Sequence, residues 1–468
     1  MTGIHIDTLI LGAGPAGLTA GYKLATEHQS ICIVDTCDKV GGLAKTLVHD
    51  DFLCDIGPHI LCSREYVYDF NPEMYAFIQH LLGAELYEYE SANRHYLESV
   101  QVGHGKYTYP VRILNAVQNA GFGGSVAIGF DYLHAKFSAG VGDDYESSLV
   151  SSLGRKLSEL FLLQIGEKTW GMPCSKMSAD VAWRVGDFSI FDVLKKQWGS
   201  FTDGFGKKGN PVNYPKHGIG VICDRLKEEI ESTGHCAWRL SSTPQKISVE
   251  QNRVVSVEIG RSDTDVESVY PEKLISSIPL LDLVEALSPK PPAEIIAAAQ
   301  SLRCRSHICV YLVFQTDSIL PEHCIYFADP EIPFARMMEQ NHYSKDMVPV
   351  GKTVLGIEYF CWFDDDVWNL SDSQICSMTR DWLQKLGIIC DQSLLDFFVH
   401  REKDAYPAYE LGYEANLGKV REYLDRISNL QIIGRVGSFS YIGQYKAMQM
   451  GWDAAESILL SDDVGGEV

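Results

Sequence analysis

The chain has 468 residues, of which 46% are hydrophobic and 22% charged, which is typical of a soluble globular protein of two or three domains. The formal net charge of −22 argues against a nucleic-acid partner or an anionic membrane surface, so any anionic substrate must be held by local arginines. No apolar run is long enough for a transmembrane helix, and the first strand begins too early for a signal peptide. The 13 cysteines are odd in number and lack metal-ligand spacing, which predicts reduced thiols, no metal site and a cytoplasmic location.

A glycine-rich turn separates the first predicted strand, Thr8–Leu11, from the first predicted helix, Ala16–Thr26. Gly12 permits the tight turn after the strand, Gly14 lets the backbone approach a pyrophosphate, and Gly17 allows the helix to pack closely on the strand. The N-terminus of the helix presents free N–H groups and a partial positive charge to the phosphates. The motif predicts a dinucleotide site, and an ordinary glycine-rich βαβ turn is the alternative.

The next predicted strand, Ser30–Val34, ends at Asp35, whose carboxylate can accept hydrogen bonds from a ribose 2′-OH. An acid at this position argues against a 2′-phosphate and therefore against NADP. A second pair of glycines closes this unit. The cofactor contacts that we predict in this part of the chain are Gly12, Gly14, Ala16, Gly17, Asp35, Gly41, Gly42 and Leu43.

The middle of the chain contains further strand and helix patterns. A strand-like stretch, Phe52–Ile56, leads into Gly57, Pro58 and His59, and residues 112–200 are rich in helical patterns. Long helices are predicted at Tyr145–Leu163, Asp187–Gln197 and, near the end of the chain, Tyr445–Leu460. Strands are predicted at Lys246–Ile259, Leu274–Ile278, Ile308–Phe314 and Val354–Phe360.

A second motif near the C-terminus, Leu430–Tyr441 followed by Ala447–Gly451, identifies the dinucleotide. An NAD enzyme has no reason to return to the cofactor site at the far end of the chain, so we expect FAD. The additional cofactor contacts that we predict are Gly57, Pro58, Gly434, Arg435, Tyr441 and Ile442.

These patterns predict an α/β fold in which a discontinuous Rossmann-type, GR2-like FAD-binding domain carries two insertions. We expect the FAD-binding domain at residues 1–105, 212–285 and 428–460. The expected insertions are a helical domain at 106–211 and an antiparallel-sheet substrate domain at 286–427, with a disordered tail at 461–468.

The segments GAGPAG, VGGLAKT and GRVGSFSYIGQYKAMQMG resemble those of the FAD-dependent amine oxidase and protoporphyrinogen oxidase superfamily, and within it most resemble UDP-galactopyranose mutases. The resemblance covers nearly the whole chain through short matching blocks. It implies that His59, in the Gly-Pro-His turn, is a catalytic residue that contacts flavin N5 and O4. A turn histidine capped by its neighbours is the alternative.

The same resemblance implies a substrate site. Arg184 and Arg336 match the two arginines that clamp the substrate diphosphate, and a structural ion pair is the alternative for each. Packing roles are equally open for the aromatic residues that match substrate-contacting positions, namely Tyr109, Trp170, Tyr326, Tyr406 and Tyr441.

The sequence departs from the mutase pattern in the nucleotide pocket. Val111 stands where the mutases stack an aromatic on uracil, Arg112 replaces a glutamine, and Gly166 replaces an asparagine that recognises the base. Stacking of an aromatic on a base is worth about 1–3 kcal/mol, and this chain lacks that aromatic. The identity of the base is therefore open, and so is a substrate that is not a nucleotide.

The resemblance implies a pyranose/furanose mutase acting on a nucleotide-diphosphate sugar. Reduced flavin N5 would attack the anomeric carbon while the arginines hold the diphosphate, and an external reductant would be required. The alternative is an FAD-dependent oxidoreductase of the amine oxidase, protoporphyrinogen oxidase or desaturase type. A flavin-binding regulator without catalysis is a third possibility.

Overall fold

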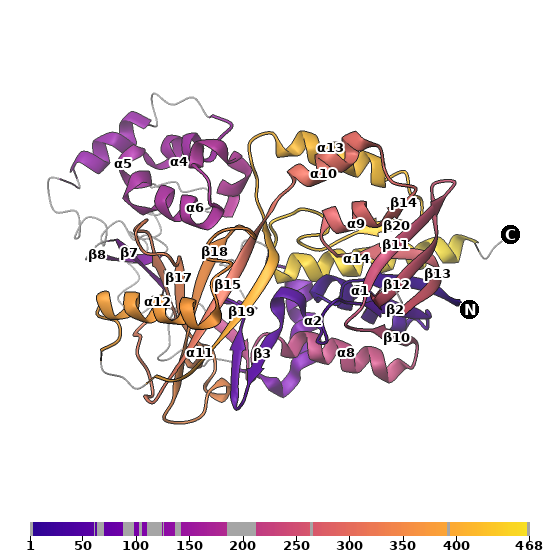
Figure 1. Ribbon diagram of the computed structural model, residues 1–468, viewed down its shortest axis with the longest axis horizontal. Helices are drawn as coiled ribbons and strands as arrows, with labels where there is room; N and C mark the ends of the chain where they lie inside the picture. Colours follow the sequence, from indigo (N-terminus) through magenta and orange to yellow (C-terminus); the bar gives the residue numbers. More distant parts are fainter. Residues whose placement is uncertain are drawn as a thin grey trace.

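The computed structural model describes residues 3–59, 61–62, 70–87, 98–102, 105–109, 124, 126–135, 142–184, 212–262, 265–390 and 394–465. Two large sheets and several groups of helices form the molecule (Figure 1). Within the described part of the chain, no helix is both long and apolar enough to cross a membrane.

The first sheet has the parallel centre of a Rossmann-type domain. Its strand order is β10 (Cys236–Arg239), β2 (Ile31–Val34), β1 (Ile4–Leu11), β13 (Asp265–Ser276), β12 (Arg253–Ser262), β11 (Thr243–Glu250) and β14 (Leu287–Ser288), with β20 (Leu430–Ile432) also paired to β13. The strands β10, β2, β1, β13 and β20 run parallel, whereas β12 is antiparallel to β11 and β13. Segments from both ends of the chain thus share one sheet.

Both faces of this sheet are buried, as expected for parallel strands. Ile10 points into a core shared with α1 (Pro15–Thr26), whereas Leu9 and Leu11 point into a second core on the opposite face. The first core also contains residues of α2 (Pro72–Leu82), α8 (Val221–Thr233) and α14 (Gln444–Gly465). The second core contains residues of α9 (Leu280–Ala286), α10 (Ala293–Ser301) and α13 (Tyr413–Leu424).

The second sheet has the order β19 (Leu394–Pro407), β15 (Cys304–Phe314), β18 (Thr353–Cys361), β17 (Arg336–Glu339), β16 (Cys324–Phe327), β7 (Glu98–Val102) and β8 (Gly105–Tyr109). All neighbouring strands in it are antiparallel except β16 and β7. One face packs under α12 (Asp372–Lys385) through residues such as Ile308 and Val310. The alternate residues Cys309 and Tyr311 join the core of the first domain, so this face is turned toward the dinucleotide-binding half.

Helices dominate residues 142–184. They form α4 (Tyr145–Leu153), α5 (Arg155–Leu157), a π-helical turn (Ser158–Leu162), α6 (Leu163–Trp170) and the 3₁₀ helices Cys174–Lys176 and Ala179–Arg184. Residues 126–135 are also helical. The smaller elements are the hairpin β3 (Thr46–His49) and β4 (Phe52–Asp55), the strands β5 (Leu61–Cys62), β6 (Leu86–Tyr87) and β9 (Val212–Pro215), α11 (Gln340–Tyr343), and 3₁₀ turns at Gly42–Ala44, Gly83–Glu85 and Lys345–Met347.

The predicted α/β fold class is confirmed, but several predicted boundaries differ from the structure. The FAD-binding piece was expected to reach residue 105, yet β7 pairs with β16 of the second sheet. Residues 286–427 were expected in the substrate domain, yet β14 joins the first sheet and α10 and α13 pack in its second core. These pairings join residues far apart in sequence, so no local pattern predicts them.

The helices also differ in length from the predictions. Gly154, with φ +83°, interrupts the segment predicted as Tyr145–Leu163, and helical structure then continues to Trp170. The last helix continues to Gly465, beyond the predicted end at Leu460 and into the predicted tail, and residues 461–464 contain no proline or glycine that would end it sooner. The helix predicted at Asp187–Gln197 lies outside the described residues.

Candidate active site

The glycine-rich turn has the geometry that a pyrophosphate site requires. Gly12 has φ +102°, and a Cβ atom there would meet the Ser277 hydroxyl at 2.2 Å. A Cβ atom at Gly17 would lie 2.0 Å from the carbonyl oxygen of Gly12, so only glycine lets α1 pack this closely on β1. Gly14 is the N-cap of α1 and has no side chain to cap the first N–H groups.

The space beside Gly14 is open on the side of the second glycine pair. A Cβ atom at Gly14 would have only the Cα atom of Gly42 within 4 Å, at 4.0 Å. Gly41 has φ +114° and donates its N–H to the carbonyl of Ala13 at 2.8 Å, which holds the second loop against the first. Leu43 lies in the 3₁₀ turn that follows. Two side-chain-free loops at a helix N-terminus fit the phosphates of a dinucleotide.

Asp35 lies at the end of β2, beside this loop. One carboxylate oxygen accepts the N–H of Ala13 at 2.7 Å and the other accepts the N–H of Cys37 at 2.8 Å. The carboxylate is thereby fixed in orientation, and its unused lone pairs can accept a ribose hydroxyl. This arrangement fits the predicted role of Asp35.

The C-terminal motif contacts the same loop. Gly434, with φ +78°, lies where a Cβ atom would be 3.4 Å from the Cβ of Ala16. Arg435 donates from Nε to the carbonyl of Ile442 at 2.8 Å, which closes the turn that carries Tyr441. The structure therefore brings together the cofactor residues that we predicted at the two ends of the chain.

A buried carboxylate supports the loop that carries His59. Asp55 is 1% exposed and accepts hydrogen bonds from the hydroxyls of Thr46 and Tyr214 and from the backbone N–H of Ile219. Tyr311 donates to its backbone carbonyl at 2.8 Å. Burial raises the pKa of the Asp55 carboxyl to about 6, against these hydrogen bonds. The base of the loop is thus tied to β3, β9 and β15.

His59 is half-buried above this anchor, after Gly57 (φ +79°) and Pro58. Its Nε2 lies 3.1 Å from the carbonyl oxygen of Ile56. Burial, and then the charge of Arg435, lower the pKa of His59 to about 4. The imidazole is therefore neutral near pH 7, and because a carbonyl only accepts, the proton resides on Nε2 and leaves Nδ1 as an acceptor.

Arg336 at the start of β17 forms a buried ion pair with Glu358 of β18. Nε donates to Oε2 and Nη2 donates to Oε1, the latter at 2.8 Å. The guanidinium carbon lies 5.7 Å from the Tyr326 ring and 5.6 Å from the Phe360 ring. The ion-pair alternative is thus present in the structure, while the predicted role as a diphosphate ligand stays a prediction.

Three of the predicted aromatic residues lie together. The rings of Trp170 and Tyr441 meet edge to face at 5.0 Å, and those of Tyr406 and Tyr441 lie 5.7 Å apart. The guanidinium carbon of Arg435 lies 5.3 Å from the Tyr406 ring and 5.7 Å from the Tyr441 ring. Phe360, which Arg336 also contacts, lies 5.3 Å from Tyr406. The group therefore connects the C-terminal motif with the Arg336 ion pair.

Other predicted residues are only partly described. Arg184 ends a 3₁₀ helix and Tyr109 ends β8, but their side chains, like Val111 and Arg112, lie outside the described residues. Gly166 is buried in α6, where a Cβ atom would lie 2.8 Å from the Tyr145 ring. Its lack of a side chain is therefore a requirement of helix packing.

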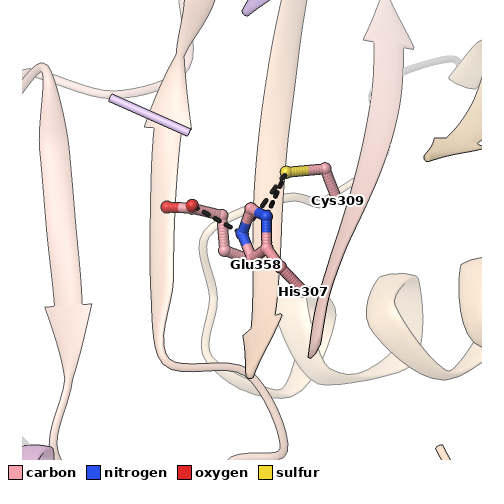
Figure 2. Close-up of side chains that lie close together, drawn as sticks. All are labelled: His307, Cys309 and Glu358. Carbon is pink, nitrogen blue, oxygen red and sulfur yellow. Dashed lines mark hydrogen bonds and ion pairs between the residues drawn. The ribbon is translucent and has the colours of Figure 1, made fainter. Parts of the chain in front are cut away.

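Glu358 and its second partner, His307 of β15, were not among the site residues predicted from the sequence. His307 Nε2 lies 2.8 Å from Glu358 Oε1, and Cys309 Sγ lies 3.6 Å from the same nitrogen (Figure 2). The available signal was a titratable residue next to or within an apolar run in each of two strands, His307 in β15 and Glu358 in β18.

Sequence comparisons recognise the N-terminal domain. Residues 10–81 match the family described as an NAD(P)-binding Rossmann-like domain. An L-amino-acid oxidase of Sistrurus catenatus edwardsii is 29% identical over 118 residues, which is 24% of this chain and 22% of the oxidase. A 4,4'-diapolycopene oxygenase of Methylomonas sp is 42% identical over 53 residues, 11% of each chain. The chain thus covers about a fifth or less of the length of these curated relatives.

Structural comparisons cover nearly the whole chain. Reduced UDP-galactopyranose mutase matches with a TM-score of 0.79 and 19% identity over 97% of this chain and 94% of the mutase. A candidate protoporphyrinogen oxidase from Exiguobacterium sp. matches with a TM-score of 0.73 and 17% identity over 98% and 100%. A putrescine oxidase bound to putrescine matches with a TM-score of 0.60 and 16% identity over 98% and 99%.

The chain shares its fold with reduced UDP-galactopyranose mutase, a candidate protoporphyrinogen oxidase and a putrescine oxidase, in agreement with the fold that the sequence motifs predicted. The open glycine loops at the N-terminus of α1, with Asp35 beside them, fit the FAD that the sequence motifs predict. Mutases and oxidases share this architecture, so the reaction is a separate question.

Proposed function

We propose that this protein is a mutase-like enzyme that interconverts the pyranose and furanose forms of a nucleotide-diphosphate sugar. The observation that carries the proposal is the position of Arg336. Its ion pair lies beside the turn that holds His59, because a Cβ atom at Gly57 would lie 3.5 Å from Arg336 Nη2. An anion ligand next to the flavin-facing turn suits a phosphorylated substrate better than an amine.

Arg336 keeps donors for such a substrate. The ion pair uses Nε and one N–H of Nη2, and Nη1 has no hydrogen-bond partner among the described residues. Each charge-assisted hydrogen bond to a phosphate oxygen is worth about 1.5–3 kcal/mol. In the proposed site the phenols of Tyr326, Tyr406 and Tyr441 add donors, and Arg184 supplies the second cation.

In the proposed site the glycine loops and Asp35 would hold FAD, which, once reduced by an external reductant, would supply a nucleophilic N5 atom for the anomeric carbon. The residues of the chain then have electrostatic and positioning tasks. Arg336 stabilises the negative charge that develops on the departing diphosphate and keeps it in place for recombination. His59 is neutral and offers Nδ1 as an acceptor, so it can orient an N–H or O–H group without adding charge. Trp170 and Tyr109 complete the proposed substrate contacts.

The proposal is tested by adding a panel of nucleotide-diphosphate sugars to the dithionite-reduced holoenzyme and separating the products by chromatography. A ring isomer formed with reduced but not with oxidised enzyme is the expected result. No isomer from any sugar of the panel, with FAD bound and reduced, would contradict the mutase reading.

A second candidate function is an FAD-dependent oxidoreductase. Glu358 neutralises the charge of Arg336, and the rings of Trp170, Tyr406 and Tyr441 form an aromatic group of the kind that can enclose an amine or a hydrophobic ring. Peroxide production from amines in air, followed with a coupled peroxidase, identifies this activity. Peroxide without sugar isomerisation would favour the oxidoreductase.

A further inference from the structure

Glu358 contacts Arg336, His307 and the turn at Gly57. The residue is completely buried and is paired in register with Arg336 on one side and Cys309 on the other. Figure 2 shows the ring of His307 between the Glu358 carboxylate and the Cys309 thiol. The residues come from β15, β17 and β18, so the cluster is built on the rigid centre of the second sheet.

His307, Cys309 and Glu358 could in principle hold a metal ion, since their ligand atoms all lie within 4.8 Å of one another. Two features oppose this interpretation. Both oxygens of Glu358 already accept hydrogen bonds from Arg336, whose positive charge would repel a cation at the same carboxylate. The 2.8 Å separation of His307 Nε2 and Glu358 Oε1 is that of a direct hydrogen bond. The hydrogen bonds of the cluster are therefore directed to Arg336 and not to a metal ion.

The ion pair fixes the orientation of the Arg336 guanidinium. A side-on fork uses Nε and Nη2, and two parallel hydrogen bonds hold the guanidinium and the carboxylate in one plane. Nη1 is the edge left for a ligand. Arg336 is 17% exposed, whereas Glu358 is 0% exposed, so only the arginine reaches toward the site.

His307 fixes the carboxylate in turn. It is 2% exposed, and its hydrogen bond gives Glu358 Oε1 a second donor besides Arg336 Nη2. Arg336 and His307 together hold the pKa of Glu358 at about 2, although burial alone raises it. The carboxylate is thus ionised and held from two directions.

The same oxygen touches the turn that carries His59. A Cβ atom at Gly57 would lie 2.7 Å from Glu358 Oε1, so the glycine backbone packs directly on the carboxylate. Moving Glu358 would therefore disturb Arg336 and this turn together.

We propose that Glu358, supported by His307, is a positioning residue that holds Arg336 with Nη1 directed to an anionic group of the substrate. Its carboxylate also fixes the position of the turn at Gly57, which packs on it. This role rests on the proposed function, because it assigns the substrate an anionic group. Glu358 itself touches no substrate.

The test compares wild-type, Glu358→Gln and Glu358→Asp holoenzymes, using a sugar nucleotide that the wild type turns over and inorganic pyrophosphate in titration calorimetry. For Glu358→Gln we expect kcat to fall at least tenfold while pyrophosphate binds no more weakly than to wild type, because the guanidinium keeps its charge but loses its orientation. Glu358→Asp keeps the buried charge and should give an intermediate kcat. It takes the place of the glutamine variant if that variant does not fold.

Glu339 provides the matched control. Like Glu358, it is a fully buried glutamate, but it lies on β17 and accepts hydrogen bonds from the backbone N–H groups of Ile319 and Leu320. Glu339→Gln should leave kcat within threefold of wild type. The variant His307→Gln keeps a donor for Glu358 Oε1 and should preserve kcat, whereas His307→Leu has no donor and should lower kcat.

The outcomes separate the two proposals. A kcat within threefold of wild type in Glu358→Gln, or an equal loss in Glu339→Gln, would overturn the positioning role. So would a loss of pyrophosphate affinity and FAD content in parallel with kcat. Wild-type holoenzyme that binds no pyrophosphate and isomerises no sugar nucleotide would instead contradict the proposed function.

Discussion

Gly451 of α14 packs against the carbonyl oxygen of Ala16 in α1, so closely that a Cβ atom at Gly451 would lie 2.0 Å from that oxygen. This contact joins residues 435 positions apart and brings the C-terminal motif to the glycine-rich turn. The cofactor site therefore forms only when both ends of the chain have folded.

Replacing Gly451 by alanine should weaken FAD binding and lower Tm by several degrees. The added methyl group forces α14 away from α1, and overpacking of this kind costs about 1–3 kcal/mol. The flavin-to-protein absorbance ratio and a thermal melt measure both effects. Gly418→Ala in α13 is the control. The added Cβ atom meets open space there, and alanine in place of glycine in a helix should raise the free energy of unfolding by about 0.5–1 kcal/mol. Equal behaviour of the two variants would contradict the packing argument.

Asp35→Asn should lower FAD affinity about 10- to 100-fold. The amide cannot accept both the Ala13 N–H and a ribose hydroxyl as well as the carboxylate does, and a lost charge-assisted hydrogen bond costs about 1.5–3 kcal/mol. Fluorescence titration of the apoprotein with FAD gives the dissociation constant. Asp38→Asn, at an exposed neighbouring position, should bind FAD as the wild type does. An unchanged constant for Asp35→Asn would remove Asp35 from the cofactor site.

Arg336→Lys should lose most turnover while retaining FAD. Lysine keeps a positive charge beside Glu358 but cannot bind the carboxylate through a fork and still present Nη1. Alanine would remove the arginine partner of the buried Glu358 and leave only His307 beside it, and breaking a buried ion pair costs about 3–5 kcal/mol, so lysine is the safer change. Arg401→Lys, which alters an ion pair with the exposed Asp372, serves as the control.

Arg184→Ala should behave like the lysine variant of Arg336, with most turnover lost and FAD retained. Steady-state rates and the flavin spectrum of each purified variant give the answer. Wild-type activity in either variant would contradict its assignment as a diphosphate ligand.

Asp55 should make the protein less stable as the pH rises from about 4 to about 6. Burial raises the pKa of its carboxyl from 3.8 to about 6, so in this window the unfolded chain loses a proton that the folded chain keeps. Each pKa unit corresponds to 1.36 kcal/mol, and the free energy of unfolding should fall by up to about 3 kcal/mol. Below pH 4 both states are protonated and no penalty exists.

Denaturant unfolding of wild type and Asp55→Asn between pH 3.5 and 7 measures this contribution. The wild type should lose stability relative to the asparagine variant through the window and run parallel to it above pH 6. Asp51→Asn, at an exposed position, should follow the wild type throughout. A constant difference between wild type and Asp55→Asn would show that Asp55 does not titrate as described.

The cofactor half of the site was predictable because its requirements are local. Gly12 and Gly41 have backbone conformations that favour glycine, and Asp35 follows a strand whose apolar run is visible in the sequence. Each signal lies within a few residues of the structure that it specifies.

The rest depends on contacts between distant segments. Glu358 meets Arg336, 22 residues away, and His307, 51 residues away, and no spacing rule connects residues of three antiparallel strands. Likewise β7 pairs with β16 across more than 200 residues, so the boundary predicted at residue 105 missed the true sheet. Titratable residues within buried strands were the one available signal of a site, and this signal does not tell which residues pair with each other.

In the proposed site Arg336 binds the phosphate of a substrate beside the flavin. A crystal structure of the reduced holoenzyme soaked with several nucleoside diphosphates tests it most directly. We expect density for two phosphates, with an oxygen hydrogen-bonded to Arg336 Nη1 and the Glu358 ion pair intact. Diphosphate density elsewhere, or none at saturating concentration while FAD is fully occupied, would contradict it.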